Sequence, residues 1–376
     1  VAQSGAEVEQ DRIGIVGGER DARGVAAIAT RGLAGARRRA TDAIERDLHR
    51  TPSCDKVAEQ YDRPGPEGTG SDGNHTPARG IYGHGMADPT LVTIDTSELT
   101  YGCLTAGDRG PLALCLHGFP DTAHGWRHLL PALADAGYRA VAPFMRGYAP
   151  TSIPNDGQFG VATLVRDATV LHEAFGGDGD AVLIGHDWGA LAAYGAANFA
   201  PERWRRVVTA AVPPPAAMAG AMLTYDQLQR SWYMFFFQVG LADFVVGMDD
   251  LAFIDRLWHD WSPGHDPGVD MEHLRASLGD PANLAAALGY YRATWGTEPP
   301  SPAYAAEMAA LGASPPQPLR YLHGRNDGCV GVEFAVDAAS SLAPGSDAII
   351  VEDAGHFLQV ERPDEFNRLV LEFLDA

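Results

Sequence analysis

Short apolar runs alternate with longer segments of helical periodicity over most of the chain beyond residue 90. The apolar runs are Leu91–Ile94, Leu112–Leu116, Ala140–Ala142, Ala181–Ile184, Val207–Val212, Leu319–Leu322 and Ala348–Val351. Their length and their mostly apolar content are typical of strands buried on both faces. From Leu112 onward most of them are separated by predicted helices, over Trp126–Ala136, Val161–Ala174 and Asp364–Leu374. Strands that alternate with helices predict an α/β fold whose central sheet is mostly parallel and flanked by helices.

The alternation stops between Pro213 and about Pro315. This interval is rich in aromatic residues, and its apolar positions have helical spacing. The helices we expect there are Tyr225–Gln238, Leu251–Trp258, Met271–Leu278, Pro281–Trp295 and Pro302–Leu311. The pattern predicts a helical cap over residues 214–315, inserted into a core made of residues 86–213 and 316–376.

The first 85 residues differ in composition from the remainder. They are polar and glycine-rich, and Pro64–Asn74 has the composition of a disordered linker. The chain begins with Val, and Met86 stands just before the first predicted strand. We therefore expect residues 1–85 to be a disordered or non-native extension and the working protein to start near Met86.

Composition narrows the class of function. The net charge of −21 argues against binding to nucleic acid or to an anionic membrane surface, since both need clustered Lys and Arg. No apolar run approaches the roughly 18 residues that a membrane-spanning helix needs. The four cysteines have no Cys-x-x-Cys spacing, which predicts reduced thiols and a cytoplasmic protein. We find no metal-ligand cluster and no nucleotide fingerprint, so we expect neither a metal nor a cofactor.

The pentapeptide Gly185-His186-Asp187-Trp188-Gly189 carries the main chemical signal. It lies between the apolar run Ala181–Ile184 and an alanine-rich helical segment. A strand, a turn with glycine on both sides and a helix make a nucleophile elbow, which exposes one side chain at the top of an α/β-hydrolase sheet. Here that side chain is an aspartate, which predicts alkyl transfer to a carboxylate in place of acyl transfer to a serine.

The partners that such a nucleophile needs follow in the expected chain order. Asp327 and His356 each come just after a predicted strand, and the order nucleophile, acid, histidine is that of the fold's triad. We assign Asp187 as nucleophile, His356 as base and Asp327 as the residue that orients it. The oxyanion hole is predicted to consist of the backbone N–H groups of Phe119, in Leu116-His117-Gly118-Phe119-Pro120, and of Trp188. We also predict a cis peptide bond between Phe119 and Pro120.

Residues 112–200 resemble the epoxide hydrolases of the α/β-hydrolase superfamily. The resemblance rests on five motifs, which are His117-Gly118-Phe119-Pro120, Trp126-Arg127, Leu133-Ala134-Asp135-Ala136-Gly137-Tyr138-Arg139, Met145-Arg146-Gly147-Tyr148 and the aspartate elbow. It implies two cap tyrosines that bind the epoxide oxygen. Tyr233 stands before Phe235-Phe236-Phe237-Gln238, as in the family, and Tyr291 stands before Arg292, with Tyr290 as its rival.

The resemblance predicts an enzyme that opens an epoxide to a vicinal diol. Asp187 would form a hydroxyalkyl ester, and water activated by His356 would hydrolyse it. His117, Trp232 and Phe357 are predicted to bind substrate. The expected partners are a small hydrophobic epoxide and water, with a homodimer as one option for the assembly. Two alternatives stay open: a haloalkane or haloacid dehalogenase that uses the same aspartate, and a non-catalytic ligand-binding protein on this scaffold.

Overall fold

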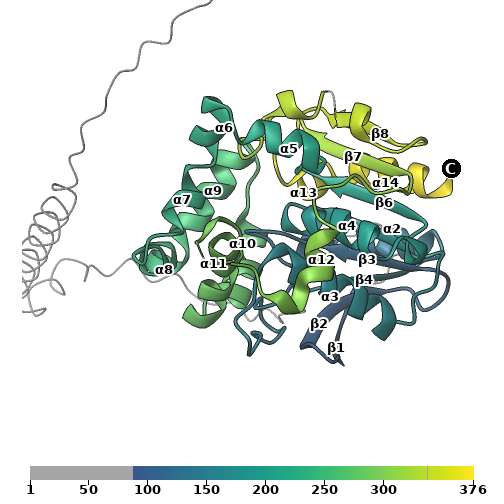
Figure 1. Cartoon of the computed structure of the whole chain (residues 1–376), viewed down its shortest axis with the longest axis horizontal. Coiled ribbons are helices and arrows are strands. Elements are labelled where there is room, and N and C mark those ends of the chain that lie inside the picture. Colours follow the sequence, from purple (N-terminus) through teal and green to yellow (C-terminus); the bar gives the residue numbers. More distant parts are fainter. Residues whose placement is uncertain (1–87, 298, 337) are drawn as a thin grey trace, which may run out of the picture. The chain divides into compact units, whose positions relative to one another are not determined.

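The computed structural model describes residues 88–297, 299–336 and 338–376, and its strands form one mixed sheet (Figure 1). In these residues the sheet has eight strands in the order β1-β2-β4-β3-β5-β6-β7-β8. The strands are β1 Thr90–Asp95, β2 Thr100–Ala106, β3 Leu112–Leu116, β4 Arg139–Pro143, β5 Val182–His186, β6 Arg206–Ala210, β7 Leu319–Gly324 and β8 Asp347–Val351. Strand β2 pairs antiparallel with β1 and β4, and the pairs from β4 to β8 are parallel. The predicted mostly parallel sheet is confirmed.

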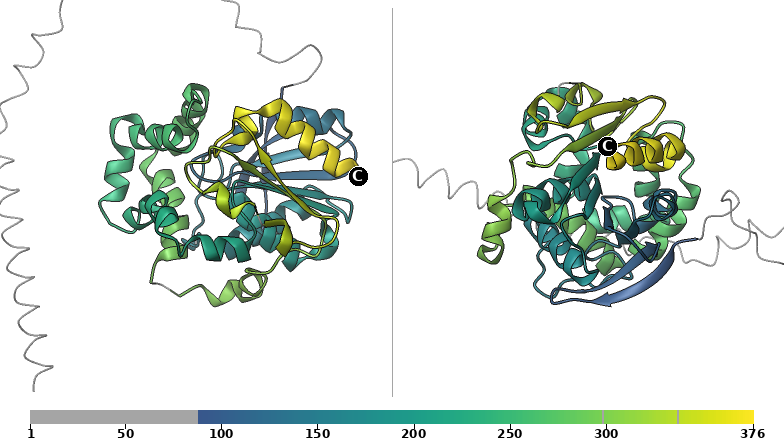
Figure 2. Two further views of the ribbon diagram at one scale, coloured as in Figure 1. Left: turned by 90° about the horizontal axis from the view of Figure 1, so that it is seen from above. Right: turned by 90° about the vertical axis from the view of Figure 1, so that its right-hand side faces the viewer.

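Helices cover both faces of this sheet. On one face α2 (Leu129–Asp135) packs on α14 (Pro363–Asp375). On the other, α3 (Val161–Ala174) packs on α4 (Trp188–Phe199). The end-on view in Figure 2 shows the two groups on opposite sides of the strands. Covering both faces explains why β3 and β5 are buried at every position and read as unbroken apolar runs in the sequence.

Between β6 and β7 the chain forms helices only, among the described residues. They are α5 Pro215–Ala221, α6 Tyr225–Arg230, α7 Trp232–Phe236, α8 Ala242–Gly247, α9 Ala252–Trp261, α10 Gly268–Leu278, α11 Pro281–Trp295 and α12 Ala305–Ala309. Figure 1 shows α6 to α11 gathered beyond one end of the sheet. These helices lie within residues 214–315, the interval in which the sequence predicts a cap.

Three expectations at the level of elements need correction. Strand β2 was not predicted, because Thr100–Ala106 contains no continuous apolar run. The single helix expected over Tyr225–Gln238 is two helices, divided at Ser231. The strand expected over Val207–Val212 ends at Ala210, since Ala211 has a φ of 67° and leaves the extended conformation.

The predicted extension over residues 1–85, the proposed start at Met86 and Cys54 lie outside the described residues. The other three cysteines, Cys103, Cys115 and Cys329, are free and buried. None of the helices described here combines the length and the apolar character that crossing a membrane requires.

Candidate active site

Asp187 occupies a strained turn between β5 and α4. Its φ of 53° and ψ of −116° lie outside the regions that non-glycine residues normally adopt. The two flanking glycines make the turn possible, because a Cβ on Gly185 would clash with the carbonyl of Gly189, and one on Gly189 with the carbonyl of Leu116. The result is a carboxylate held at the amino end of α4, where the helix dipole favours negative charge.

His356 and Asp327 meet Asp187 from the ends of two neighbouring strands. Asp327 follows β7 and His356 follows β8. His356 Nδ1 lies 3.0 Å from Asp327 Oδ2, and His356 Nε2 lies 3.8 Å from Asp187 Oδ2. The other oxygen of Asp327 accepts hydrogen bonds from the backbone N–H groups of Cys329, at 2.7 Å, and Val330, at 2.9 Å. The structure thus brings together the three side chains that the sequence assigns to the triad.

The two carboxylates strongly shift the pKa of His356. Burial alone lowers the pKa of His356, but the negative charges of Asp327 and Asp187 outweigh it and raise the pKa to about 10. Burial raises the pKa of Asp327. The facing His356 and the backbone donors lower it by more, so that the net shift of this pKa is downward. With Asp187 ionised, His356 therefore carries a proton at neutral pH.

The backbone after β3 supplies a donor to the nucleophile. The N–H of Phe119 donates to Asp187 Oδ1 at 2.7 Å, and the Phe119–Pro120 peptide bond is cis, as predicted. Gly118 lies against this carboxylate and against the backbone nitrogen of Trp188, with no room for a Cβ. The two amides predicted for the oxyanion hole are therefore next to the Asp187 carboxyl group, and the Phe119 amide contacts it directly.

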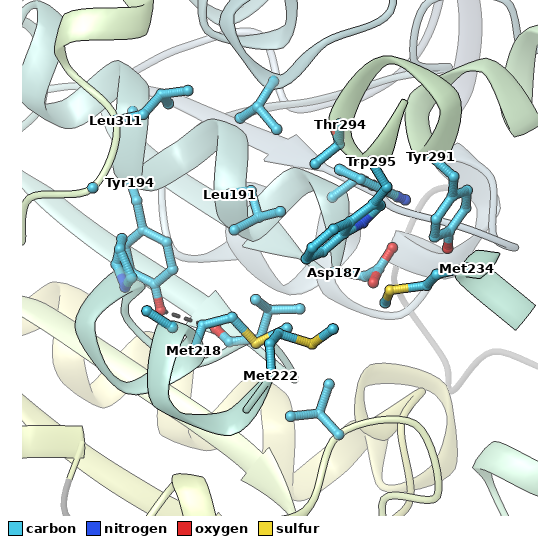
Figure 3. Close-up of a pocket in the computed structure, with 18 of the residues that line it drawn as sticks. Asp187, Leu191, Tyr194, Met218, Met222, Met234, Tyr291, Thr294, Trp295 and Leu311 are labelled. Carbon is cyan, nitrogen blue, oxygen red and sulfur yellow. Dashed lines mark hydrogen bonds between the residues drawn. The ribbon is translucent and has the colours of Figure 1, made fainter. Parts of the chain in front are cut away.

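A cavity of about 450 Å³ opens onto Asp187 (Figure 3). Its polar groups are few and lie mainly near the nucleophile, where Tyr233, Tyr291 and Cys329 join Asp187 in the lining. The remaining walls are largely apolar, and they include Leu191, Met218, Met222, Met234, Trp295 and Leu311. An apolar cavity with a few converging polar groups is the usual form of a small-molecule site.

Both tyrosines named in the sequence analysis reach this cavity. The rings of Tyr233, on α7, and Tyr291, on α11, lie 5.6 Å apart between centroids. Burial raises the pKa of each phenol well above its usual range, so both stay protonated at neutral pH. Tyr290, the rival of Tyr291, does not line the cavity, and its hydroxyl donates to the carbonyl of Arg146 at 2.9 Å.

Three residues predicted to bind substrate lie outside this cavity lining. His117 is fully buried and serves the backbone, because Nδ1 contacts the Gly118 carbonyl at 2.9 Å and Nε2 accepts from Met145 N–H at 2.9 Å. Phe357 is stacked on Trp258 at 3.4 Å between centroids. Trp232 is half exposed and packs on Phe253. Trp232 and Phe357 each stand next to a predicted catalytic residue in the sequence, but their side chains pack elsewhere.

Sequence reasoning also missed lining residues. Cys329 contacts the Tyr233 hydroxyl through its sulfur at 3.3 Å, while its N–H holds Asp327. Its position two residues after Asp327 was the signal that could have found it. Met218 lies on α5, a helix that the periodicity did not predict, and Met222 directly follows that helix. Within the described residues no group of His, Cys, Asp and Glu side chains could hold a metal ion.

Comparison with known proteins places the chain in a family. Residues 111–363 match the family model described as alpha/beta hydrolase fold. Epoxide hydrolase A of Mycobacterium tuberculosis is 30% identical over 329 residues, which cover 77% of this chain and 98% of that protein. Human Epoxide hydrolase 4 is 29% identical, over 77% of this chain and 81% of its own length. The crystal structure of Epoxide Hydrolase A from Mycobacterium thermoresistibile superposes with a TM-score of 0.63 at 26% identity, over 77% of this chain and 98% of that one.

The fold and the site thus define an α/β hydrolase with an aspartate at the elbow. The chain belongs to the α/β-hydrolase superfamily, and it is similar to proteins named epoxide hydrolase over 77% of its length. The fold class and the family resemblance expected from the sequence are confirmed.

Proposed function

We propose that the protein hydrolyses epoxides to vicinal diols through a covalent ester on Asp187. The observation that carries this proposal is that one ionisable carboxylate and two protonated phenols line the same apolar cavity. Ring opening needs both at once, a nucleophile for carbon and a hydrogen-bond donor for the oxygen that leaves. The similarity to proteins named epoxide hydrolase supports the same activity.

In the first step the Asp187 carboxylate attacks an epoxide carbon, and the carbon–oxygen bond of that carbon breaks. Tyr233 and Tyr291 donate hydrogen bonds to the oxygen as it acquires negative charge. Two buried donors held in place by packing stabilise this charge more than water would, because they need no reorganisation. The step leaves a hydroxyalkyl ester on Asp187.

Ester formation changes the charge around His356 and so prepares the second step. While Asp187 and Asp327 are both negative, His356 is held as an imidazolium. The ester is neutral, so one of the two charges disappears and the pKa of His356 falls. The imidazolium proton ends on the expelled oxygen, and the neutral histidine then accepts a proton from water. The hydroxide attacks the ester carbonyl, the diol leaves, and Asp187 and the imidazolium are restored.

The second candidate is a dehalogenase, and one observation favours it. Trp188 lines the cavity next to the nucleophile, and its buried Nε1 donor has no hydrogen bond of normal geometry. The Trp188 side chain lies close enough to Tyr291 to offset part of the rise in that phenol's pKa. An indole N–H could bind a departing halide. A dehalogenase would need a second side-chain donor for the halide, expected at the position of Phe119, where this chain has an apolar ring. The epoxide assignment therefore accounts for more of the site.

A single turnover in heavy-oxygen water tests the covalent route. With enzyme in excess over styrene oxide, the first diol should contain no heavy oxygen, because its new oxygen comes from Asp187. A labelled diol from the first turnover would contradict the ester intermediate. Replacing His356→Gln should let the ester accumulate, seen as an intact-protein mass increase equal to one epoxide, whereas Asp187→Asn should show no such increase.

Bromoalkanes separate the two candidates in the same assay. We expect diol release from styrene oxide and no bromide release from bromobutane. Bromide release without diol would favour the dehalogenase, and binding of either compound without product would favour a non-catalytic protein.

A further inference from the structure

The cavity extends from Asp187 in one direction, here called the arm, and aromatic side chains fill the space on the opposite side. At the reacting end, Asp187, Tyr233 and Tyr291 are at most 8% exposed. Away from that end the lining includes the half-buried Leu311 and the exposed Gly312. Figure 3 shows Asp187 and Tyr291 on one side of the cavity and Leu311 on the opposite side, with Leu191 between them. The exposure gradient therefore marks where the cavity opens to solvent.

The arm runs along helix α4. Trp188, Leu191 and Gly195 line it and are spaced by three and four residues, which places them on one face of that helix. The path from Asp187 to Gly195 covers eight residues, or roughly 12 Å of helix rise. The opposite wall comes from Pro215, Met218 and Met222 of the α5 segment, which also repeat at helical spacing. Both walls are apolar, and methionine adapts to varied apolar ligands.

Aromatic side chains fill the space on the other side of the two tyrosines. Phe119 and Phe237 pack against Tyr291 at 5.2 and 5.0 Å between ring centroids. Trp261 packs against Tyr233 at 4.9 Å. All three are at most 2% exposed, and none of them lines the cavity. A ligand whose oxygen sits between the phenols therefore has room for a substituent in one direction.

From this asymmetry we propose that the substrates are terminal epoxides with one elongated apolar tail. The tail lies in the arm between α4 and α5, and the unsubstituted ring carbon faces the aromatic cluster. Substituents on both ring carbons would place one chain against Phe119, Phe237 or Trp261, where interiors resist added volume. This inference rests on the proposed function and specifies its substrate class.

A series of terminal epoxyalkanes measures the length of the arm. Diol formation is followed for epoxybutane, epoxyhexane, epoxyoctane and epoxydecane, and each kcat/KM is divided by the uncatalysed hydrolysis rate of the same compound. Burial of each added methylene should raise this ratio about fourfold. The gain should level off when the tail passes the mouth beside Leu311 and Gly312. A ratio independent of tail length would overturn the proposal.

An isomer pair tests the filled side at constant hydrophobicity. The ratio of kcat/KM to the uncatalysed rate is compared for terminal epoxyoctane and for the trans isomer with its ring at the centre of the same chain. This ratio should be roughly tenfold or more higher for the terminal epoxide. Equal values for the two isomers would show that both sides of the ring are accommodated, and the proposal would fall.

Two substitutions connect the effect to the arm. Leu191→Trp and Met218→Trp add volume from opposite walls, and each should reduce the epoxydecane-to-epoxybutane ratio to near one. Leu228→Trp is the matched control, because Leu228 lies on α6 and does not line the cavity. An unchanged ratio in both arm variants, with native circular dichroism, would refute the proposal. Diol from every epoxide without tail or isomer dependence removes this inference alone, whereas no diol from any of them removes the proposed function as well.

Discussion

Three features of the fold face the Asp187 carboxylate at the reacting end of an apolar cavity. The Phe119 N–H binds one oxygen of Asp187, and His356 faces the other. The amino end of α4 adds a favourable dipole at the same atoms. Because the side chains around Asp187 are buried, these few interactions act at a lower dielectric than in solution and are stronger there.

The two phenols make the first prediction at the scale of single residues. Tyr233→Phe and Tyr291→Phe should each slow ester formation about a hundredfold, since each removes a donor to the expelled oxygen. The rate is read from the first turnover by rapid quench, before ester hydrolysis contributes.

Tyr290→Phe is the matched control for this prediction. Its hydroxyl binds the carbonyl of Arg146 away from the cavity, so its loss should cost about 1 kcal/mol of stability and leave ester formation unaffected. If Tyr290→Phe slowed the first turnover as much as Tyr291→Phe, the assignment of the second phenol would be wrong.

Sequence reasoning reaches some of these residues and not others for a definable reason. Asp187, Asp327 and His356 were predictable, because strand ends fix their place along the same sheet edge. Tyr290 and Tyr291 could not be separated by spacing alone, since consecutive helical residues point about 100° apart and only packing shows which faces the cavity. Cys329 escaped notice because its contact with Tyr233 joins residues distant in sequence.

Helices are easier to predict from the sequence than strands, because a helix forms mainly through interactions between residues close in sequence. Helices α3 and α11 have the bounds that the sequence predicts. Helix α3 has an apolar face, and α11 begins with Pro281 after the capping residue Asp280 and ends before Gly296. Strand β2 was missed, since its residues make sense only through pairing with β1 and β4. The break at Ser231 is also tertiary in origin, because the Gln227 amide beside it bonds both Ser231 Oγ and the Cys329 carbonyl.

A prediction at the scale of elements concerns the attachment of α10 to the core. Arg127, which follows the helical turn Ala123–Trp126, donates to Asp270 on α10 at 2.6 and 3.4 Å, and both side chains are largely buried. Asp270→Asn would leave a buried guanidinium without its counter-charge. We expect a loss of about 3 kcal/mol in the free energy of unfolding, measured by urea titration.

Asp255→Asn provides the comparison. Asp255 forms an exposed pair with His259 at 3.9 Å, so its removal should cost under about 1 kcal/mol. Equal losses for the two variants would mean that the link between Arg127 and α10 adds no more than a surface pair.

At the scale of the whole molecule, buried histidines couple folding to pH. Burial lowers the pKa of His117 to about 3 and of His186 to about 4, so both are neutral in the folded protein at pH 5. In the unfolded chain they bind protons below about pH 6.5. The unfolded state therefore gains protons as pH falls from 7 to 5, and each histidine costs about 2 kcal/mol of stability across that window.

Other groups act in the opposite direction, so the contribution of one histidine must be isolated. Burial raises the pKa of Asp121 to about 7, and protonation of this carboxyl offsets part of the loss as pH falls. His356 also opposes it, because its raised pKa keeps it protonated in the folded state throughout. A difference between two proteins that share Asp121 and His356 cancels both effects.

His117→Gln isolates the histidine contribution and also tests the role of this residue. A glutamine does not titrate, and its amide can donate to the Gly118 carbonyl or accept from Met145 N–H as the imidazole does. Urea unfolding at pH 7 and pH 5 should show that the variant loses about 2 kcal/mol less than the native protein over this interval. Since His117 lies outside the cavity lining, KM for styrene oxide should stay the same at pH 7. An unchanged pH dependence together with a raised KM would restore His117 as a substrate-binding residue.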